Sequence, residues 1–359
     1  MINVTKTQLP PLKNYLKYLE KIWETSWVTN KGPLSLELEK KLEDYLKVQN
    51  LLAVSNGTIA MQLSFKALGL TGEVLTTPFT FPATTTALLW EGLEPVFADI
   101  DLETFNIDPR QIEEKISPKT SAILAVHVYG NPCQVEILEK IVKKHNLRLI
   151  FDAAHTFGVE YKNQSVLNFG DVSTLSFHAT KTFHTIEGGA VITKNKTVYS
   201  EIDLLRNFGI ETYEKVATAG INAKMNEFQA AMGLCNLATI ELNRVKREKI
   251  YNLYTESFKN SPKFLLQKFI GSKHNYSYFP LVFESIKIRD FIYNKLLEQQ
   301  VKARKYFYPL TSDFDFIKSA KKQNLKNARR ISDGVLCLPL YADLKLSDAE
   351  TIVYIISHY

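Results

Sequence analysis

The stretch from Leu149 to Gly189 constrains this chain more than any other part of the sequence. It opens with a short apolar run, residues 149–151, which predicts the end of a buried strand and stops at Asp152. A second strand-like piece, residues 174–177, is followed almost at once by Lys181. A carboxylate that ends one strand and a lysine just after the next are expected at the ligand-binding edge of a sheet.

This pairing suits a site for pyridoxal phosphate (PLP). In such sites a lysine holds the cofactor as a Schiff base, and a carboxylate pairs with the pyridinium nitrogen. The lysine must be partly desolvated so that its amine is neutral often enough to attack an aldehyde, and the freed amine can then move a proton. We therefore expect Lys181 to be catalytic, Asp152 to keep the ring nitrogen protonated, and His155 to lie over the ring or hydrogen-bond its phenolic oxygen. Each residue alone is a weak signal, because a single Asp or Lys is usually a solvated surface group.

The pieces of this stretch resemble the signature of the DegT/DnrJ/EryC1/StrS family of PLP-dependent sugar aminotransferases. They stand in the family's order and at similar spacing: Asp152-Ala153-Ala154-His155, Gly170-Asp171, Ser176-Phe177, Lys181 and Gly188-Gly189. The resemblance extends from about Trp27 to about Tyr341. It implies an α/β fold, fold type I of the PLP-dependent transferases, with a mixed, mostly parallel sheet flanked by helices. It also implies a large PLP-binding domain over residues 1–240 and a smaller C-terminal α/β domain over residues 241–359.

Strand-like and helix-like segments alternate along the chain, which favours a mostly parallel sheet covered on both faces. At 359 residues the chain exceeds one ordinary core, which agrees with one large and one small domain. The expected strands include residues 51–54, 174–177, 190–193, 276–283 and 335–341. The expected helices are residues 13–25, 34–46, 59–68, 108–116, 135–145, 228–253 (one long helix) and 286–299.

The turn between strand 51–54 and the following helix contains Gly57 and Thr58. A turn that opens a helix is good geometry for phosphate, because free backbone N–H groups and the positive end of the helix dipole face the anion. In the family this Gly-Thr pair holds the PLP phosphate, so the resemblance assigns that role to Gly57 and Thr58. It also implies that Ser176 contacts the phosphate and that Phe81 stacks on the ring.

The resemblance further implies a homodimer with shared active sites, because the family's Gly-x-Asn segment reaches the neighbouring subunit's cofactor. That segment nominates Asn222. Two positions nearby depart from the family pattern: Phe208 stands where His is usual, and Lys224 stands where Arg is usual. Either change would alter substrate contacts without touching the chemistry of Lys181.

Four residues are nominated for substrate binding. Thr29 lies in a Trp-Val-Thr-x-x-Gly-Pro element that resembles one near the family's active site, and His184 follows Lys181 closely. Arg304 and Tyr308 lie in a segment that resembles the family's strand-to-loop element near the sugar, although their alignment is loose.

The resemblance implies transfer of an amino group from L-glutamate to C-4 of dTDP-4-keto-6-deoxyglucose, giving dTDP-4-amino-4,6-dideoxyglucose. Amination at C-3 of a dTDP-3-keto-6-deoxyhexose stays open, because no sequence feature excludes it. A non-transaminating dehydratase or a regulator on the same fold is a third alternative. Family dehydratases carry His in place of the lysine, however, and no DNA-binding segment is visible that would mark a regulator. The final product is expected in an O-antigen or lipopolysaccharide pathway.

The composition excludes several other classes. A net charge of +6 without a dense basic patch or binding motif argues against nucleic acid as a partner. The three cysteines, Cys133, Cys235 and Cys337, are scattered and lack metal-ligand spacing, so neither a disulfide framework nor a metal site is indicated. Neither a signal peptide nor an apolar run of ~18 residues is present, so we expect no membrane partner and a cytoplasmic location.

Overall fold

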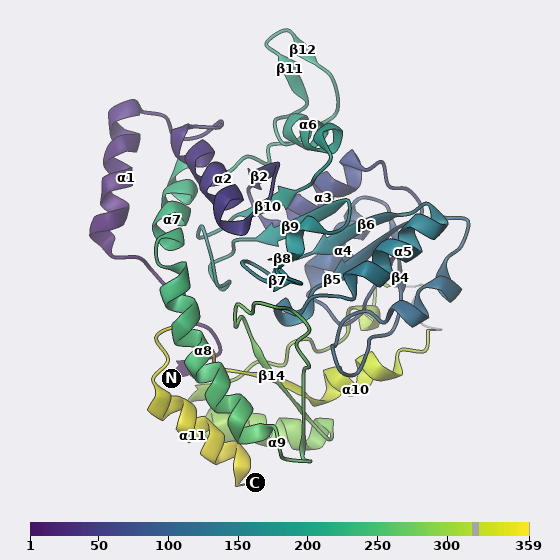
Figure 1. The fold of residues 1–359 in the computed structure, drawn as a ribbon, viewed down its shortest axis with the longest axis vertical. Helices are drawn as coiled ribbons and strands as arrows, with labels where there is room; N and C mark the ends of the chain where they lie inside the picture. The colour runs from purple at the N-terminus through teal and green to yellow at the C-terminus, as the bar shows by residue number, and fades with distance from the viewer. Residues whose placement is uncertain (318–322, 359) are drawn as a thin grey trace.

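The computed structural model describes residues 1–317 and 323–358, and its core is built on two β-sheets of different size (Figure 1). In the larger sheet, β10 is antiparallel to both of its neighbours, whereas the other adjacent strands are parallel. The prediction of a mixed, mostly parallel sheet is confirmed. The seven strands, in spatial order, are β2 (Leu51–Val54), β10 (Gly189–Ile192), β9 (Val172–Ser176), β6 (Arg148–Asp152), β5 (Thr120–Val126), β3 (Glu73–Thr76) and β4 (Glu94–Phe97).

Helices cover both faces of the large sheet, because its strands are apolar on both sides. In β5, Ile123 and Ala125 pack into the core that contains α2, α5 and α7, whereas Ala122 and Leu124 pack against α3 and α4 on the other face. The helices of this part are α1 (Leu12–Thr25), α2 (Pro33–Leu46), α3 (Gly57–Ala67), α4 (Pro82–Trp90), α5 (Val135–His145), α6 (Lys196–Leu205) and α7 (Glu227–Leu237).

The smaller sheet is antiparallel and contains β13 (Phe264–Leu266), β14 (Phe279–Phe283) and β16 (Val335–Leu338). It shares an apolar core with α8 (Ile240–Phe258), α9 (Ile286–Glu298) and α11 (Leu346–Ser357). The first residues of the chain lie beside this part, because β1 (Ile2–Asn3) pairs with β15 (Val301–Lys302), and both termini lie at the lower end of Figure 1. The division at residues 1–240 and 241–359 stays a prediction.

The prediction of one long helix over residues 228–253 is wrong, because the chain forms two helices there, α7 and α8. The carbonyl of Asn236 accepts the N–H of Thr239 at 3.1 Å, which tightens the last turn of α7. The side chain of Asn236 donates to the carbonyl of His184 at 2.8 Å. These contacts end the first helix before the second begins at Ile240.

The prediction of a helix over residues 108–116 is also wrong. The structure has two short 3-10 turns there, Pro109–Gln111 and Glu113–Lys115. The carboxylate of Asp108 accepts the backbone N–H of Arg110 at 3.0 Å and also pairs with the guanidinium of Arg110. A short polar side chain that binds the backbone two residues on competes with the helical hydrogen-bond pattern.

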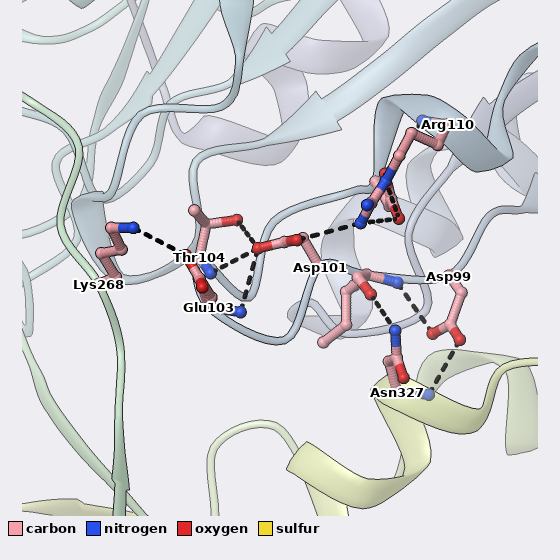
Figure 2. Close-up of polar contacts among 9 residues, drawn as sticks. Asp99, Asp101, Glu103, Thr104, Arg110, Lys268 and Asn327 are labelled. Carbon is pink, nitrogen blue, oxygen red and sulfur yellow. Dashed lines mark hydrogen bonds and ion pairs between the residues drawn. The ribbon is translucent and has the colours of Figure 1, made fainter.

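Polar contacts join the loop after β4 to α10 (Lys326–Gly334), as Figure 2 shows. The buried carboxylate of Asp99 accepts the N–H groups of Asn327 at 2.9 Å and Ala328 at 2.8 Å, so it binds the first turn of α10. At the other end of α10, the hydroxyl of Ser332 donates to the carbonyl of Phe307 at 2.7 Å. Asp99 is therefore connected through α10 to the loop that contains Phe307.

A small hairpin, β11 (Ile210–Thr212) and β12 (Lys215–Val216), extends away from the body at the top of Figure 1 and exposes Tyr213 completely. A second pair of short strands, β7 (Glu160–Tyr161) and β8 (Gln164–Ser165), follows β6. Within the described residues, no helix has the length and apolar character that crossing a membrane requires. The same residues contain no group of three or more His, Cys, Asp or Glu side chains that could hold a metal ion.

The carboxylate of Glu227, which is almost completely buried, holds the start of α2. It accepts the N–H groups of Leu34 at 2.7 Å and Ser35 at 2.9 Å. An added Cβ at position 32 would lie 2.4 Å from Cδ of Glu227, so a side chain there would displace this carboxylate from the start of α2. The carboxylate thus satisfies two of the N–H groups that a helix start leaves free.

We expect Glu227→Gln to lower the free energy of unfolding by about 1–3 kcal/mol, because a carboxamide leaves one buried N–H facing its NH₂ group. Chemical denaturation at fixed protein concentration measures this change. Glu37→Gln, in α2 itself, is the control. It removes a solvent-facing ion pair with Lys41, which is worth about 0.5 kcal/mol or less. Equal losses in the two variants would contradict the role given to Glu227.

Candidate active site

A cavity of about 510 Å³ lies where strands of the large sheet end. Because β2 and β9 are both antiparallel to β10, they run in the same direction and end at the same edge as β6. Asp152 at the end of β6, Ser176 at the end of β9 and Gly57 just after β2 all line the cavity. The loop after β15 supplies another part of the wall, with Arg304 and Phe307.

Most of the residues that the sequence nominates for the site line this one cavity. They are Gly57, Thr58, Phe81, Asp152, His155, Ser176, Lys181 and Arg304. The four that do not line it are Thr29, His184, Asn222 and Tyr308. Asp152 ends β6, Ser176 ends the neighbouring strand β9, and Lys181 lies in the turn just after β9, so the pairing of these two strands brings the three residues together.

Lys181 lies in the turn after β9, where its N–H donates to the carbonyl of His178 at 2.9 Å. Burial lowers the pKa of the Lys181 amine to about 8; the charge of Asp152 opposes this shift and that of Arg304 adds to it. At pH values above about 8 the amine is therefore mostly neutral and able to act as a nucleophile or a base.

Asp152 carries the opposite shift. Burial raises the pKa of its carboxyl group, whereas hydrogen bonds from Thr84 and Ala154 and the positive charge of Lys181 act to lower it. The hydroxyl of Thr84 donates to Oδ2 at 2.7 Å, and the N–H of Ala154 donates to Oδ1 at 3.2 Å. A buried carboxylate held in this way is suited to pair with a cationic ring nitrogen.

His155 is held neutral beside them. Burial, followed by the charge of Lys181, lowers the pKa of His155 well below its ordinary value. Its Nδ1 accepts the N–H of Tyr129 at 3.2 Å, which leaves the hydrogen on Nε2. The ring lies nearly parallel to that of Phe307, with 6.1 Å between centroids. The imidazole is thus oriented as a neutral ring in the cavity wall.

One corner of the cavity is built to accept an anion. The side chain of Asn56 caps α3 through the N–H of Ile59 at 2.9 Å, which leaves the N–H groups of Gly57 and Thr58 at the helix start. A Cβ on Gly57 would lie 2.9 Å from Cβ of Ser176, and a Cβ on Gly189 would lie 2.6 Å from the backbone of Asn56. Glycine at these two positions lets the turn approach β9 and β10 closely.

Aromatic rings line another part of the cavity. Phe81 is 44% exposed, whereas Phe79 two residues earlier is buried completely in the apolar core. Phe81 meets Tyr306 edge to face at 6.4 Å, and the Arg304 guanidinium lies 3.7 Å from the Tyr306 ring centroid. Of the two phenylalanines, Phe81 is the one available to a ligand ring.

This set of residues fits PLP. The helix start and Ser176 suit the phosphate, Asp152 suits the ring nitrogen, and Phe81 and His155 offer rings for stacking. Lys181 supplies the amine for the aldehyde.

The four predicted site residues that do not line the cavity have different environments in this chain. His184 is buried, with Nε2 2.9 Å from the carbonyl of Gln8, and Tyr308 lies over the guanidinium of Arg289 at 4.4 Å. The carbonyl of Thr29 accepts the indole N–H of Trp27 at 2.5 Å. Asn222 is exposed. Their proposed contacts with substrate or cofactor stay predictions.

Phe208 and Lys224, the two positions that depart from the family pattern, contact each other. The ammonium of Lys224 lies 4.7 Å from the ring centroid of Phe208, which is 47% exposed. Burial, followed by the charges of Arg206 and Lys31, lowers the pKa of Lys224. The two substitutions therefore act as one local change at this surface.

Sequence reasoning missed the support around Asp152 and part of the wall. Thr84 contacts Asp152 directly, and Tyr306 and Phe307 line the cavity from the C-terminal part of the chain. Thr80, just before α4, and Thr84, in its first turn, lie four residues apart, and this pair of hydroxyls was the available signal. Nothing local marks Phe307, because its position depends on contacts with α10.

We expect Lys181 in the PLP-free enzyme to react with an amine-modifying reagent with a midpoint near pH 8, because only the neutral, uncombined amine attacks. Pulse labelling across a pH series, followed by peptide mass spectrometry, measures the midpoint. The exposed Lys40, whose pKa is raised by its hydrogen bond to Asp44, is the internal control and should label only at higher pH. Coincident midpoints for the two lysines would contradict the shift.

Comparison with known proteins identifies this arrangement. The sequence matches the DegT/DnrJ/EryC1/StrS aminotransferase family over residues 12–357. It is 44% identical over 356 residues to the dTDP-4-amino-4,6-dideoxy-D-glucose transaminase of Shigella dysenteriae, a match that covers 98% of this chain and 97% of the relative.

Solved structures agree with the sequence match. The fold superimposes on DesI, crystallised in the presence of its TDP-sugar product, with a TM-score of 0.93 at 32% identity; the match covers 99% of this chain and 92% of DesI. NtdA of Bacillus subtilis, crystallised with bound cofactor PMP, matches with a TM-score of 0.90 at 29% identity, covering 97% of this chain and 81% of NtdA. The chain is therefore a PLP-dependent sugar aminotransferase that belongs to the DegT/DnrJ/EryC1/StrS family.

Proposed function

We propose that this enzyme transfers an amino group from L-glutamate to C-4 of dTDP-4-keto-6-deoxyglucose, giving dTDP-4-amino-4,6-dideoxyglucose. The observation that carries the proposal is the 44% identity, over nearly the full length of both chains, to a transaminase named for that product. An aminotransferase of nucleotide sugars needs an amino donor, and glutamate is the donor that the family resemblance implies. Amination at C-3 is the alternative that the product assay below decides.

PLP, when bound, supplies an electron sink for the carbon that gains or loses the amino group. Lys181 holds the cofactor and, once displaced, carries the proton to and from that carbon, a role that suits an amine with a pKa of about 8. Asp152 holds the ring nitrogen in its protonated form. Gly57 and Thr58 bind the phosphate through their backbone N–H groups at the start of α3.

Substrate binding is assigned to the part of the cavity that the loop after β15 lines. Arg304 faces the cavity from the loop after β15, and its guanidinium is suited to a carboxylate or a phosphate oxygen. Phe81 and Tyr306 offer apolar and aromatic surface beside it. A lysine at position 181, rather than the histidine of family dehydratases, favours transamination over dehydration.

We also propose that the enzyme is a homodimer in which each cavity is completed by the partner. Asn222 is exposed, lies outside the cavity of its own chain, and pairs in an isolated antiparallel bridge with Asn207, three residues before β11 begins. Tyr213 at the tip of the hairpin of β11 and β12 and Phe208 before it are exposed aromatic side chains that a partner would cover. In this arrangement Asn222 reaches the cofactor held by Lys181 of the other subunit.

Product identity tests the proposed reaction. Purified enzyme with PLP and L-glutamate should convert dTDP-4-keto-6-deoxyglucose, and NMR should locate the new nitrogen at C-4. Lys181→Ala is the matched control and should lose both the visible absorbance of the lysine-bound cofactor and turnover. Nitrogen at C-3, formed only from the 3-keto isomer, would replace the proposed regiochemistry, and no amine from either sugar would overturn the proposed substrate.

Subunit complementation tests the shared site. Lys181→Ala and Asn222→Ala are each expected to be nearly inactive, whereas a refolded one-to-one mixture should regain about a quarter of wild-type activity. Half of the randomly formed dimers contain both variants, and one of their two sites then has both Lys181 and Asn222. Light scattering establishes the dimer. A mixture as inactive as the parents would show that Asn222 serves its own chain or none.

A further inference from the structure

Three successive threonines in the first turns of α4 direct their hydroxyl groups to three different places. Thr86 donates to the carbonyl of Pro82 at 3.0 Å, which is the usual bond of a helical threonine to its own helix. Thr85 donates to the hydroxyl of Thr311 at 2.9 Å. Thr84 donates to Oδ2 of Asp152 at 2.7 Å, so its hydroxyl leaves the helix for the buried carboxylate.

A second hydroxyl lies behind Thr84. The Oγ1 atoms of Thr80 and Thr84 are 2.8 Å apart, and both side chains are buried. Each hydroxyl has a single hydrogen, and an ionised carboxylate only accepts hydrogen bonds. When Asp152 is ionised, the hydrogen of Thr84 therefore points to Asp152, and the hydrogen of Thr80 points to Thr84. The chain of donors has one direction, which ends at the carboxylate.

We propose that Thr80 and Thr84 form a two-hydroxyl relay that keeps Asp152 ionised and oriented for the ring nitrogen of PLP, which makes Thr84 a positioning residue of this enzyme. The inference rests on the proposed pairing of Asp152 with the cofactor. Hydrogen bonds to the charged form of an acid favour that form, and successive hydroxyls polarise one another. Burial acts in the opposite direction on Asp152, so the relay supports the state in which the acid can pair with a pyridinium.

Other ionisable groups around Asp152 belong to other elements and stay in place when Thr84 is changed. Lys181 faces the carboxylate from the turn after β9, and Arg304 acts on Lys181 from the loop after β15. His155 lies three residues after Asp152. The backbone N–H of His127, just after β5, donates to the carbonyl of Asp152 at 3.1 Å, and burial lowers the pKa of both imidazoles. A change in the titration of Asp152 on altering Thr84 therefore reports the lost hydroxyl.

The test compares Thr84→Val, Thr84→Ser and Thr85→Val in the full-length enzyme. Apoenzyme is titrated with PLP across a pH series, and absorbance and fluorescence give the Kd at each pH. The acid limb is the part of this profile at low pH where the affinity for PLP falls. Thr84→Val should weaken PLP binding at neutral pH by about tenfold and move the acid limb upward by about one pH unit, because Asp152 then takes up its proton at higher pH. Thr84→Ser keeps a hydroxyl and should restore both values.

Thr85→Val is the matched control, because it removes a buried hydroxyl from the same turn without touching Asp152, and its acid limb should stay at the wild-type pH. Thr80→Val removes the outer hydroxyl and should move the limb in the same direction by a smaller amount, which keeps the test available where Thr84→Val does not fold. The relay is overturned if Thr84→Val leaves the acid limb of PLP binding at the wild-type pH, or if Thr80→Val does so where Thr84→Val does not fold. It is also overturned if Thr84→Ser does not restore the acid limb to the wild-type pH. Wild-type PLP affinity in Asp152→Asn overturns instead the pairing on which the relay rests.

Discussion

The opposite pKa shifts of Asp152 and Lys181 are the physical condition on which this site depends. Removal from water disfavours the charged form of both groups, so burial raises the pKa of the Asp152 carboxyl group and lowers the pKa of the Lys181 amine. The two charges partly offset this effect for each other. An amine that loses its proton near pH 8 and an acid that still ionises coexist here because the surrounding chain supplies hydrogen bonds to the acid.

The two parts of the chain share that task. The large sheet provides the base, since β2, β6 and β9 end at one edge and β10 has Gly189 where the turn after β2 passes closely over it. Another part of the wall belongs to the C-terminal part, where Phe307 is held by α10, and α10 is held in turn by Asp99 from the loop after β4. The chemistry and the shape of the cavity thus come from different segments that are joined by a few buried polar contacts.

Sequence alone predicted the base of the site and much of the fold, because those features follow from local order. Asp152 and Ser176 end apolar strands, and Gly57 and Lys181 lie in the turns after apolar strands, so their shared edge could be inferred from strand direction. The wall could not be inferred in this way, since Tyr306 and Phe307 depend on long-range packing. The break between α7 and α8 was also missed, because it depends on Asn236 binding a residue about fifty positions earlier.

The contact between Phe208 and Lys224 has a consequence for how this surface can change during evolution. A cation beside an aromatic face is stabilised by that face, so replacing either residue alone leaves the other in an environment made for its partner. We expect the two positions to covary among relatives, with His and Arg or Phe and Lys inherited as sets. Introducing only Phe208 or only Lys224 into a related enzyme would not reproduce this contact, because it needs both residues.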